Sequence, residues 1–186
     1  MFIDLGDEGT SKGGSNSSDI IFVMELDKEG TDSGDNKYYR YKAILNGEET
    51  KVKFELTNKF APAKTQQILF TDVEYDSETG FVTAAEAVTD PIGSDDYDSV
   101  LGIKNASVSQ KAGVVTVTFV KDGKEVNCKY YLADDYTIFV IEDMDDVSTV
   151  TAKKLASDYE KGGLNADIYG VLNSDDEYTA LYISVK

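Results

Sequence analysis

Residues 112–142 constrain the fold more than any other stretch of the chain. Two runs rich in β-branched and aromatic residues meet at Asp122-Gly123, a dipeptide that favours the left-handed backbone of a type I′ hairpin turn. A third such run, residues 137–141, follows after the acidic pair at 134–135, where we expect the strand to break. The stretch therefore predicts three consecutive strands of one sheet.

Turn signals divide most of the remaining chain into further strands. The strongest is Asn46-Gly47, which joins residues 37–45 to residues 48–56, and apolar and polar residues alternate in the second arm. A first strand is expected at residues 19–26, before a loop at 28–36. Two more hairpins are expected, one that joins residues 66–75 to 80–88 and one that joins 166–172 to 178–185.

One helix is predicted, at residues 149–161, where apolar residues recur at helical spacing. Asp146 or Ser148 is available as its N-cap, and Gly162-Gly163 ends it. With about ten strands and one short helix, the chain is predicted to be mainly β. Closely spaced hairpins favour an antiparallel sandwich or one or more small barrels over βαβ units.

Composition suggests where the chain divides. Residues 1–18 are rich in Gly, Ser and Asp and predict a flexible linker. We expect one β subdomain at 19–90 and a second, with the helix, at 99–186; one continuous domain over 19–186 is the alternative. The hairpin at 40–52 resembles the hairpin at 116–128 in the position of its turn and in the alternation of apolar and polar residues. Internal duplication and chance similarity between two ordinary hairpins both explain this.

The chain is strongly acidic, with 35 Asp and Glu residues against 18 Lys and Arg and a net charge of −17. This charge argues against nucleic acid and against anionic membrane surfaces as partners. No apolar run reaches the roughly 18 residues that cross a membrane, so no membrane insertion is expected. The first residues lack the basic and apolar regions of a signal peptide. We expect the chain to be a fragment of a longer protein without its signal peptide.

The absence of histidine excludes Ser–His–Asp and Cys–His nucleophilic sites and histidine-based zinc sites. The single cysteine, Cys128, lies in a predicted strand and is interpreted as a small buried hydrophobe. With 35 acids, carboxylate pairs suited to a glycosidase are unavoidable and carry no specificity. We therefore predict that the chain is not an enzyme and holds no catalytic, cofactor-binding or metal-binding residues.

Four acidic clusters raise the question of calcium, because hard cations bind grouped carboxylates. None fits the EF-hand pattern; the best start, Asp143 and Asp145, has Val147 at the third ligand position. We interpret them as solvated turns. The clusters are Asp32/Asp35, Asp95/Asp96/Asp98, Asp143/Asp145/Asp146 and Asp175/Asp176/Glu177.

Tyrosine is unusually frequent, with twelve copies. Exposed tyrosines make adaptable contact surfaces, whereas half-buried tyrosines are ordinary strand residues; both readings stay open. The residues in question are Tyr38, Tyr39, Tyr41, Tyr130, Tyr131 and Tyr136.

Three short motifs follow one another at characteristic intervals. They begin at Tyr41 (Tyr-Lys-Ala-Ile-Leu-Asn-Gly-Glu), at Val73 (Val-Glu-Tyr-Asp-Ser-Glu-Thr-Gly-Phe-Val-Thr) and at Leu132 (Leu-Ala-Asp-Asp-Tyr-Thr-Ile-Phe-Val-Ile-Glu). Over residues 38–186 this order resembles the β-rich repeat regions of large cell-surface proteins of Gram-positive anaerobes, those that carry S-layer homology modules. The resemblance implies an extracellular location and a structural role, with no catalytic residues. No wall-attachment module lies in this chain.

These observations lead to three ranked hypotheses. The first is a non-catalytic extracellular module of a larger bacterial surface protein, acting as structural spacer or interaction domain beside neighbouring domains of that protein. The second is a surface module that binds a carbohydrate or a protein and is stabilised by calcium. The third is a hydrolase that uses a pair of acids.

Overall fold

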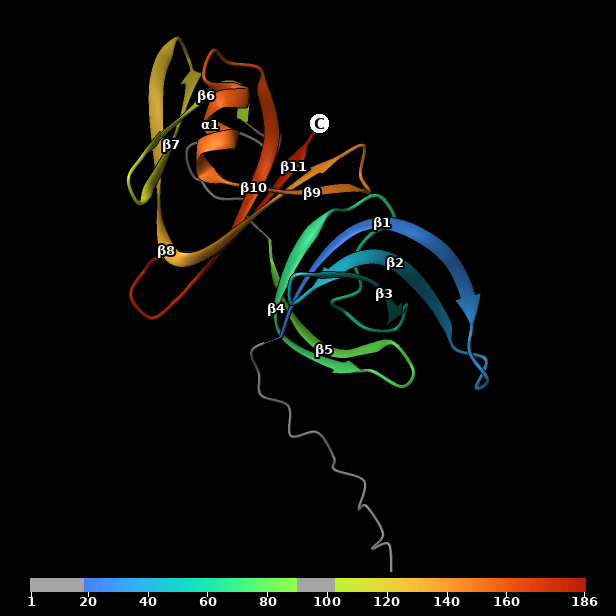
Figure 1. Cartoon of the computed structure of the whole chain (residues 1–186). Coiled ribbons are helices and arrows are strands. Elements are labelled where there is room, and N and C mark those ends of the chain that lie inside the picture. The colour runs from blue at the N-terminus through green and yellow to red at the C-terminus, as the bar shows by residue number, and fades with distance from the viewer. Residues whose placement is uncertain (1–18, 90–102) are drawn as a thin grey trace, which may run out of the picture.

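The computed structural model describes residues 19–89 and 103–186 (Figure 1). These residues contain eleven strands and one short helix, which confirms the mainly β prediction. The elements are β1 (Asp19–Thr31), β2 (Lys37–Leu45), β3 (Glu48–Glu55), β4 (Ile68–Asp76), β5 (Phe81–Val88), β6 (Ile103–Lys111), β7 (Val114–Lys121), β8 (Lys124–Glu142), β9 (Asp146–Val150), α1 (Ala152–Tyr159), β10 (Leu164–Leu172) and β11 (Tyr178–Val185).

Strands β1 to β5 form a closed barrel in the order β1-β2-β3-β5-β4, called the first barrel below. Its neighbours are antiparallel except β3 and β5, which pair in parallel at Lys53 and Phe81. The segment between β3 and β4 closes one end, because the Tyr41 hydroxyl donates to the Pro62 carbonyl at 2.8 Å and Phe60 packs on the barrel core. The β2–β3 and β4–β5 hairpins are those predicted from their turns.

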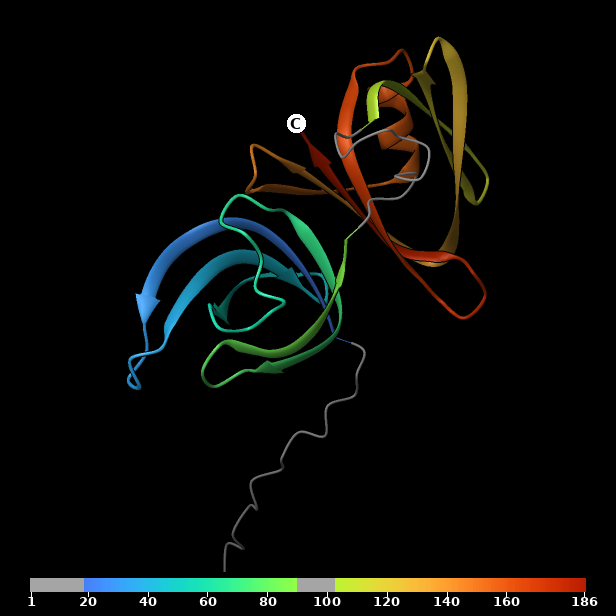
Figure 2. The same cartoon turned by 180° about the vertical axis from the view of Figure 1, so that it is seen from behind.

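Strands β6 to β11 form a six-stranded mixed sheet in the order β11-β10-β6-β7-β8-β9, which with α1 we call the second unit. Because β11 also pairs in parallel with β8, five of these strands close into a ring. Helix α1 connects the third and fourth strands of the ring, and its Ala152 and Leu155 are buried in the core. All views show α1 on the side of the second unit away from the first barrel (Figures 1 and 2).

The two units share one strand order: first, second, third, fifth, fourth, with the third and fifth strands parallel. The two similar hairpins of the sequence join the second and third strands in both. Their turns also agree, with φ of 49° at both Asn46 and Asp122 and positive φ at the glycine that follows each. The sequence similarity therefore falls on equivalent positions of the two units. The predicted division into two β subdomains stays a prediction, and the predicted linker at 1–18 and the boundary between residues 90 and 99 lie outside the described residues.

The predicted break at 134–135 is wrong, because β8 runs through it as one strand of 19 residues. Its first half pairs with β7 and its second half with β9 and β11. The two aspartates are exposed and lie where the partners change, with a register shift relative to β11. Acidic residues at this point mark a change of neighbour and not a turn.

Two other boundaries differ from the prediction. Strand β1 continues to Thr31 into the expected loop, because its residues 28–31 pair with residues 37–40 of β2. Gly30 lies directly under the Tyr38 ring, where an added Cβ would be 2.5 Å from the ring. The helix begins at Ala152 and not at residue 149, because residues 146–150 form β9 against β8. Thr151 is the N-cap, and its hydroxyl accepts from the Lys154 N–H at 3.2 Å.

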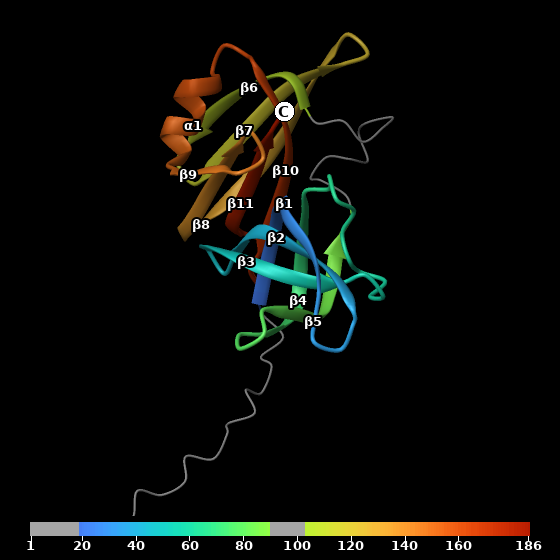
Figure 3. The ribbon, with the colours of Figure 1, turned by 90° about the vertical axis from the view of Figure 1, so that its right-hand side faces the viewer.

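An apolar junction joins the two units. In β1, Ile21 and Val23 face the barrel interior, whereas Phe22 and Met24 face the second unit. In β8, Phe139 and Ile141 face the junction in the same alternating way. Strands buried on both faces read as continuous apolar runs, which explains the apolar sequences of β1 and the end of β8. Figure 3 shows the two units stacked along this contact.

Tyr182 of β11 lies at the centre of the junction, between Phe22 of the first barrel and Phe139 of the second unit. Its ring is stacked on both, with centroids 5.0 Å apart in each pair and interplanar angles of 9° and 11°. Burial raises the pKa of the Tyr182 hydroxyl to about 12. The tyrosine therefore stays neutral at all physiological pH values and acts here as a packing residue.

Polar contacts surround this apolar centre. Lys42 of β2 pairs with Glu25 at 3.0 Å and with Asp145, which lies in the β8–β9 turn of the second unit. The buried Ser184 hydroxyl donates to the Gln67 side chain, whose Nε2 donates to the Met144 carbonyl at 3.4 Å. The junction is thus apolar inside and hydrogen-bonded at its edge.

Replacing Tyr182 with Ala should lower the free energy of unfolding by about 3–5 kcal/mol, because it leaves a cavity between two aromatic rings. Urea unfolding followed by circular dichroism measures this change. Tyr131→Ala is the matched control, because Tyr131 is 53 % exposed and its loss should change stability by no more than about 0.5 kcal/mol. Equal effects of the two substitutions would contradict the junction.

Candidate functional site

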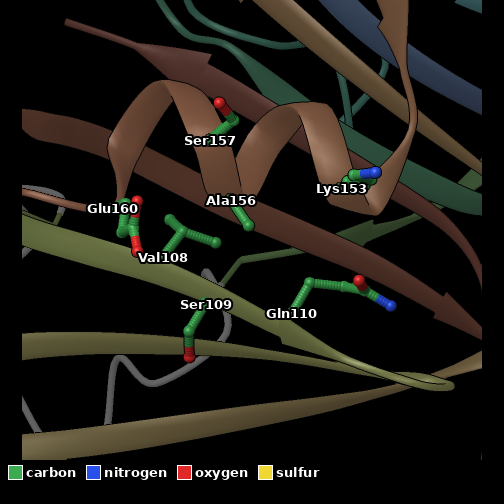
Figure 4. A pocket seen from close by; sticks show the side chains of 7 residues that line it. All are labelled: Val108, Ser109, Gln110, Lys153, Ala156, Ser157 and Glu160. Atoms are coloured by element: carbon green, nitrogen blue, oxygen red, sulfur yellow. The ribbon is translucent and has the colours of Figure 1, made fainter.

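A hollow of about 340 Å³ lies between α1 and β6 (Figure 4). Val108 and Ala156 point toward each other from the strand and the helix and form an apolar floor. The other residues that line the hollow are polar or charged: Ser109, Gln110, Lys153, Ser157 and Glu160. The hollow is at the lower end of the size range of small-molecule sites.

The helix sets the arrangement of the charged side chains. Lys153 and Glu160 are seven residues apart, so the helical rise separates their backbones by about 10 Å along the axis. Gln110 extends from β6 beneath the helix, whereas Ser109 points away from it (Figure 4). The hollow therefore has an ammonium group at one end and a carboxylate at the other, and the Gln110 amide lies at the Lys153 end (Figure 4).

A second hollow, of about 270 Å³, lies at the end of α1 and shares Glu160 with the first. Glu125 also lines it, so two carboxylates meet at one opening. Both glutamates are exposed. A glycosidase acid needs an apolar pocket that keeps it protonated near neutral pH, and these exposed side chains have no such pocket. The arrangement offers polar contacts to a ligand and no activated group.

Three of the predicted acidic clusters lie within the described residues, and the structure shows what some of their side chains contact. Asp32 accepts from the backbone N–H groups of Gly34 and Asn36, both at 2.8 Å. Asp145 pairs with Lys42, as described above. Asn173 closes the third turn, where its side chain accepts from the backbone N–H groups of residues 175 and 177 at 2.9 Å.

No group of three or more Cys, Asp or Glu side chains that could hold a metal ion occurs within residues 19–89 and 103–186. The fourth predicted cluster, Asp95/Asp96/Asp98, lies outside the described residues. The expectation that the chain has no metal, cofactor or catalytic residues stays a prediction.

Most of the singled-out tyrosines do not form a surface. Tyr38, Tyr41 and Tyr130 are buried, and Tyr39 and Tyr136 are partly buried. Tyr131 alone among the six is fully exposed, at 53 %. Cys128 is partly buried and packs against the core of the second unit, as its place in a strand suggested.

Asp27 of β1 is the centre of an ion-pair cluster on the first barrel. It accepts from Lys51 at 2.9 Å and from the Arg40 Nε at 2.5 Å. The hydrogen bond from Lys51, together with Arg40, holds the pKa of the Asp27 carboxyl below its ordinary value. This cluster ties β1, β2 and β3 together and is structural, since all its charges are paired.

Sequence reasoning missed Gln110, Lys153 and Glu160 as neighbours. The strand residue and the helix residues are more than forty positions apart, and each alone is an ordinary surface residue. Their proximity comes from the packing of α1 on β6, which no local pattern predicts. The apolar face of a helix predicts that the helix packs on a sheet, but it does not predict which strand of the sheet the helix covers.

Comparison with known proteins gives no family: no family model and no curated protein matches the chain. Among the residues that the structure describes, no helix has the length and apolar character needed to span a membrane. Function must therefore be argued from the residues themselves.

Asp27→Asn should destabilise the chain at neutral pH, and the difference from the unsubstituted protein should shrink in acid. A carboxyl whose pKa is lowered on folding stabilises above its unfolded pKa of about 3.9, and this contribution is lost as the pH falls through the lower folded value. Urea unfolding of both proteins between neutral pH and the acid range measures the difference. The exposed Asp134→Asn is the control; a pH-independent effect of Asp27→Asn would refute the ion-pair account.

Proposed function

We propose that the chain is a non-catalytic extracellular module of a larger bacterial surface protein and acts there as a structural spacer. The observation that carries this proposal is the apolar junction, which continues from one β unit into the other through Phe22, Tyr182 and Phe139. Units within one chain move relative to each other by default, unless their interface is large and apolar. This interface is apolar at its centre.

A spacer must keep a fixed distance between the domains on either side of it. Two flexibly linked units would not do this, whereas two units packed together through an apolar junction transmit position along their common length. The edge contacts support the same role, because Lys42, Gln67 and Ser184 fix the rotation of one unit about the other. The charge of the chain also fits this role, since a net charge of −17 keeps closely spaced copies of the module soluble and apart from one another.

The extracellular location rests on the resemblance of residues 38–186 to surface-protein repeats. The neighbouring domains of the same protein are then its first partners. The described residues offer open polar hollows and paired charges in place of an enclosed, activated site, which supports the non-catalytic part of the proposal.

Antibodies raised against the purified chain should label intact cells of the organism that makes it, and mild trypsin treatment of those cells should remove the label. Fluorescence microscopy and flow cytometry measure both effects, with a cytoplasmic protein as the control for cell integrity. Labelling that appears only after the cells are permeabilised would refute the extracellular role.

A further inference from the structure

The outer face of β6, β7 and β8 carries a regular array of hydroxyl and amide side chains. Cross-strand pairing places the array in two rows, each with one residue from every strand. One row is Ser107, Thr118 and Asn127, and the other is Ser109, Thr116 and Lys129. We call these six residues the hydroxyl face. Neighbouring strands are about 4.8 Å apart, so a ligand that lies across them meets a polar group at every strand.

Alternation along the strands separates this face from the core. Val108 and Val117 lie between residues of the hydroxyl face, Phe119 follows Thr118, and all three are buried on the other side of the sheet. The hydroxyl face also has internal order, because the Thr118 hydroxyl donates to the Asn127 side-chain oxygen at 2.6 Å. This bond fixes the amide and leaves its N–H groups as donors for a ligand.

An aromatic side chain borders the hydroxyl face. Tyr131 follows Lys129 by two residues on the same side of β8 and pairs with Val114 across the strands. Its ring is 53 % exposed. An exposed tyrosine beside hydroxyl and amide groups combines a flat apolar ring with hydrogen-bond donors and acceptors.

The hydroxyl face contains no carboxylate, although 35 of the 186 residues are acidic. Glu125 and Glu160 border it at one end, where they line the second hollow together with Ser107 and Thr118. The first barrel is different at the equivalent positions, counted from the two similar turns. There Arg40, Lys42 and Lys51 occupy the places of Thr116, Thr118 and Asn127, and all three are engaged in ion pairs. One face is thus committed to internal contacts, whereas its counterpart is polar, with Lys129 as its one charged side chain.

We propose that the hydroxyl face, with Tyr131, is a docking surface for a neutral polysaccharide. Sugar hydroxyls both donate and accept hydrogen bonds, as Ser, Thr and Asn do, and the apolar side of a sugar ring packs on an aromatic ring. The proposal goes beyond the spacer role, which depends on the junction and holds whether or not a glycan binds.

Other classes of partner fit this face less well. An anionic polymer is repelled by the net charge of −17, and a basic protein finds its complement on the acidic remainder of the surface. A peptide that adds a strand would pair with a free edge, here residues 124–131 of β8, which pair with β7 alone, and would contact that backbone edge in place of the side chains of the hydroxyl face. An amphipathic helix needs an apolar groove, which the six polar residues do not provide.

The test measures binding of the full chain to immobilised neutral polysaccharides, namely a glucan, a mannan, a galactan and chitin, with anionic polygalacturonate for comparison. Biolayer interferometry gives the affinities. We expect at least one neutral polymer to bind and polygalacturonate not to bind. Tyr131→Ala and Thr116→Asp should each weaken binding about tenfold, the equivalent of one lost stacking or hydrogen-bond contact.

Matched variants away from the face separate the proposal from general effects. Leu172→Ala removes another exposed apolar side chain, and Thr149→Asp adds the same charge to the exposed strand β9. Both should bind as the unsubstituted chain does, and all four variants should keep its melting temperature. The proposal fails if no neutral polymer binds, if the face variants bind as tightly as the controls, or if polygalacturonate binds best.

Discussion

The stacking of Tyr182 between Phe22 and Phe139 is the contact on which the arrangement of the chain depends. These rings close an apolar cluster to which β1, β2 and β4 of the first barrel and β8, β10 and β11 of the second unit contribute. Without the contact, apolar side chains on the outer faces of both units would be exposed to water. Patches of this kind on separate units lead to association with other molecules. The junction therefore fixes geometry and also protects solubility.

The two units show how one strand order can carry different surfaces. Both rings are closed at one end by the segment between the third and fourth strands, an irregular loop in the first barrel and α1 in the second unit. Their cores are filled in the same alternating way. On the outside they differ: the outer face of the first two strands is apolar and ion-paired in the first barrel, and hydroxyl-rich in the second. Fold and function are separable, and function must be read from these outer positions.

Sequence reasoning predicted the parts of this fold that depend on neighbours in the chain. Asn46-Gly47 and Asp122-Gly123 require a left-handed turn, and both hairpins form as expected. Long-range effects were not predictable. The change of partner along β8 depends on β11, some forty residues away, and the Tyr38 ring that covers Gly30 lies on another strand. The apolar run of β1 indicated burial on both faces, but nothing local named the second unit as the cover.

The same limit applies to the candidate site and to the hydroxyl face. Ser, Thr and Asn at alternating positions of three strands are ordinary in each strand alone. Only the register between the strands aligns them into rows, and only the burial of the intervening valines shows which side they occupy. The acidic clusters, by contrast, attracted notice in the sequence; where the structure describes them, Asp32 closes its own turn and Asp145 pairs with Lys42 across the junction.

The central claim is that the two β units form one rigid body, and a distance measurement across the junction tests it most directly. Spin labels are attached to Ser77→Cys in the first barrel and to Ser174→Cys in the second unit, in a chain whose Cys128 is replaced by Ala. Both labelled positions lie in exposed turns. Double electron–electron resonance should give a single narrow distance distribution. A broad distribution of the label-to-label distance, or several separate distances, would contradict a rigid junction, because the junction residues are unchanged in this doubly labelled chain.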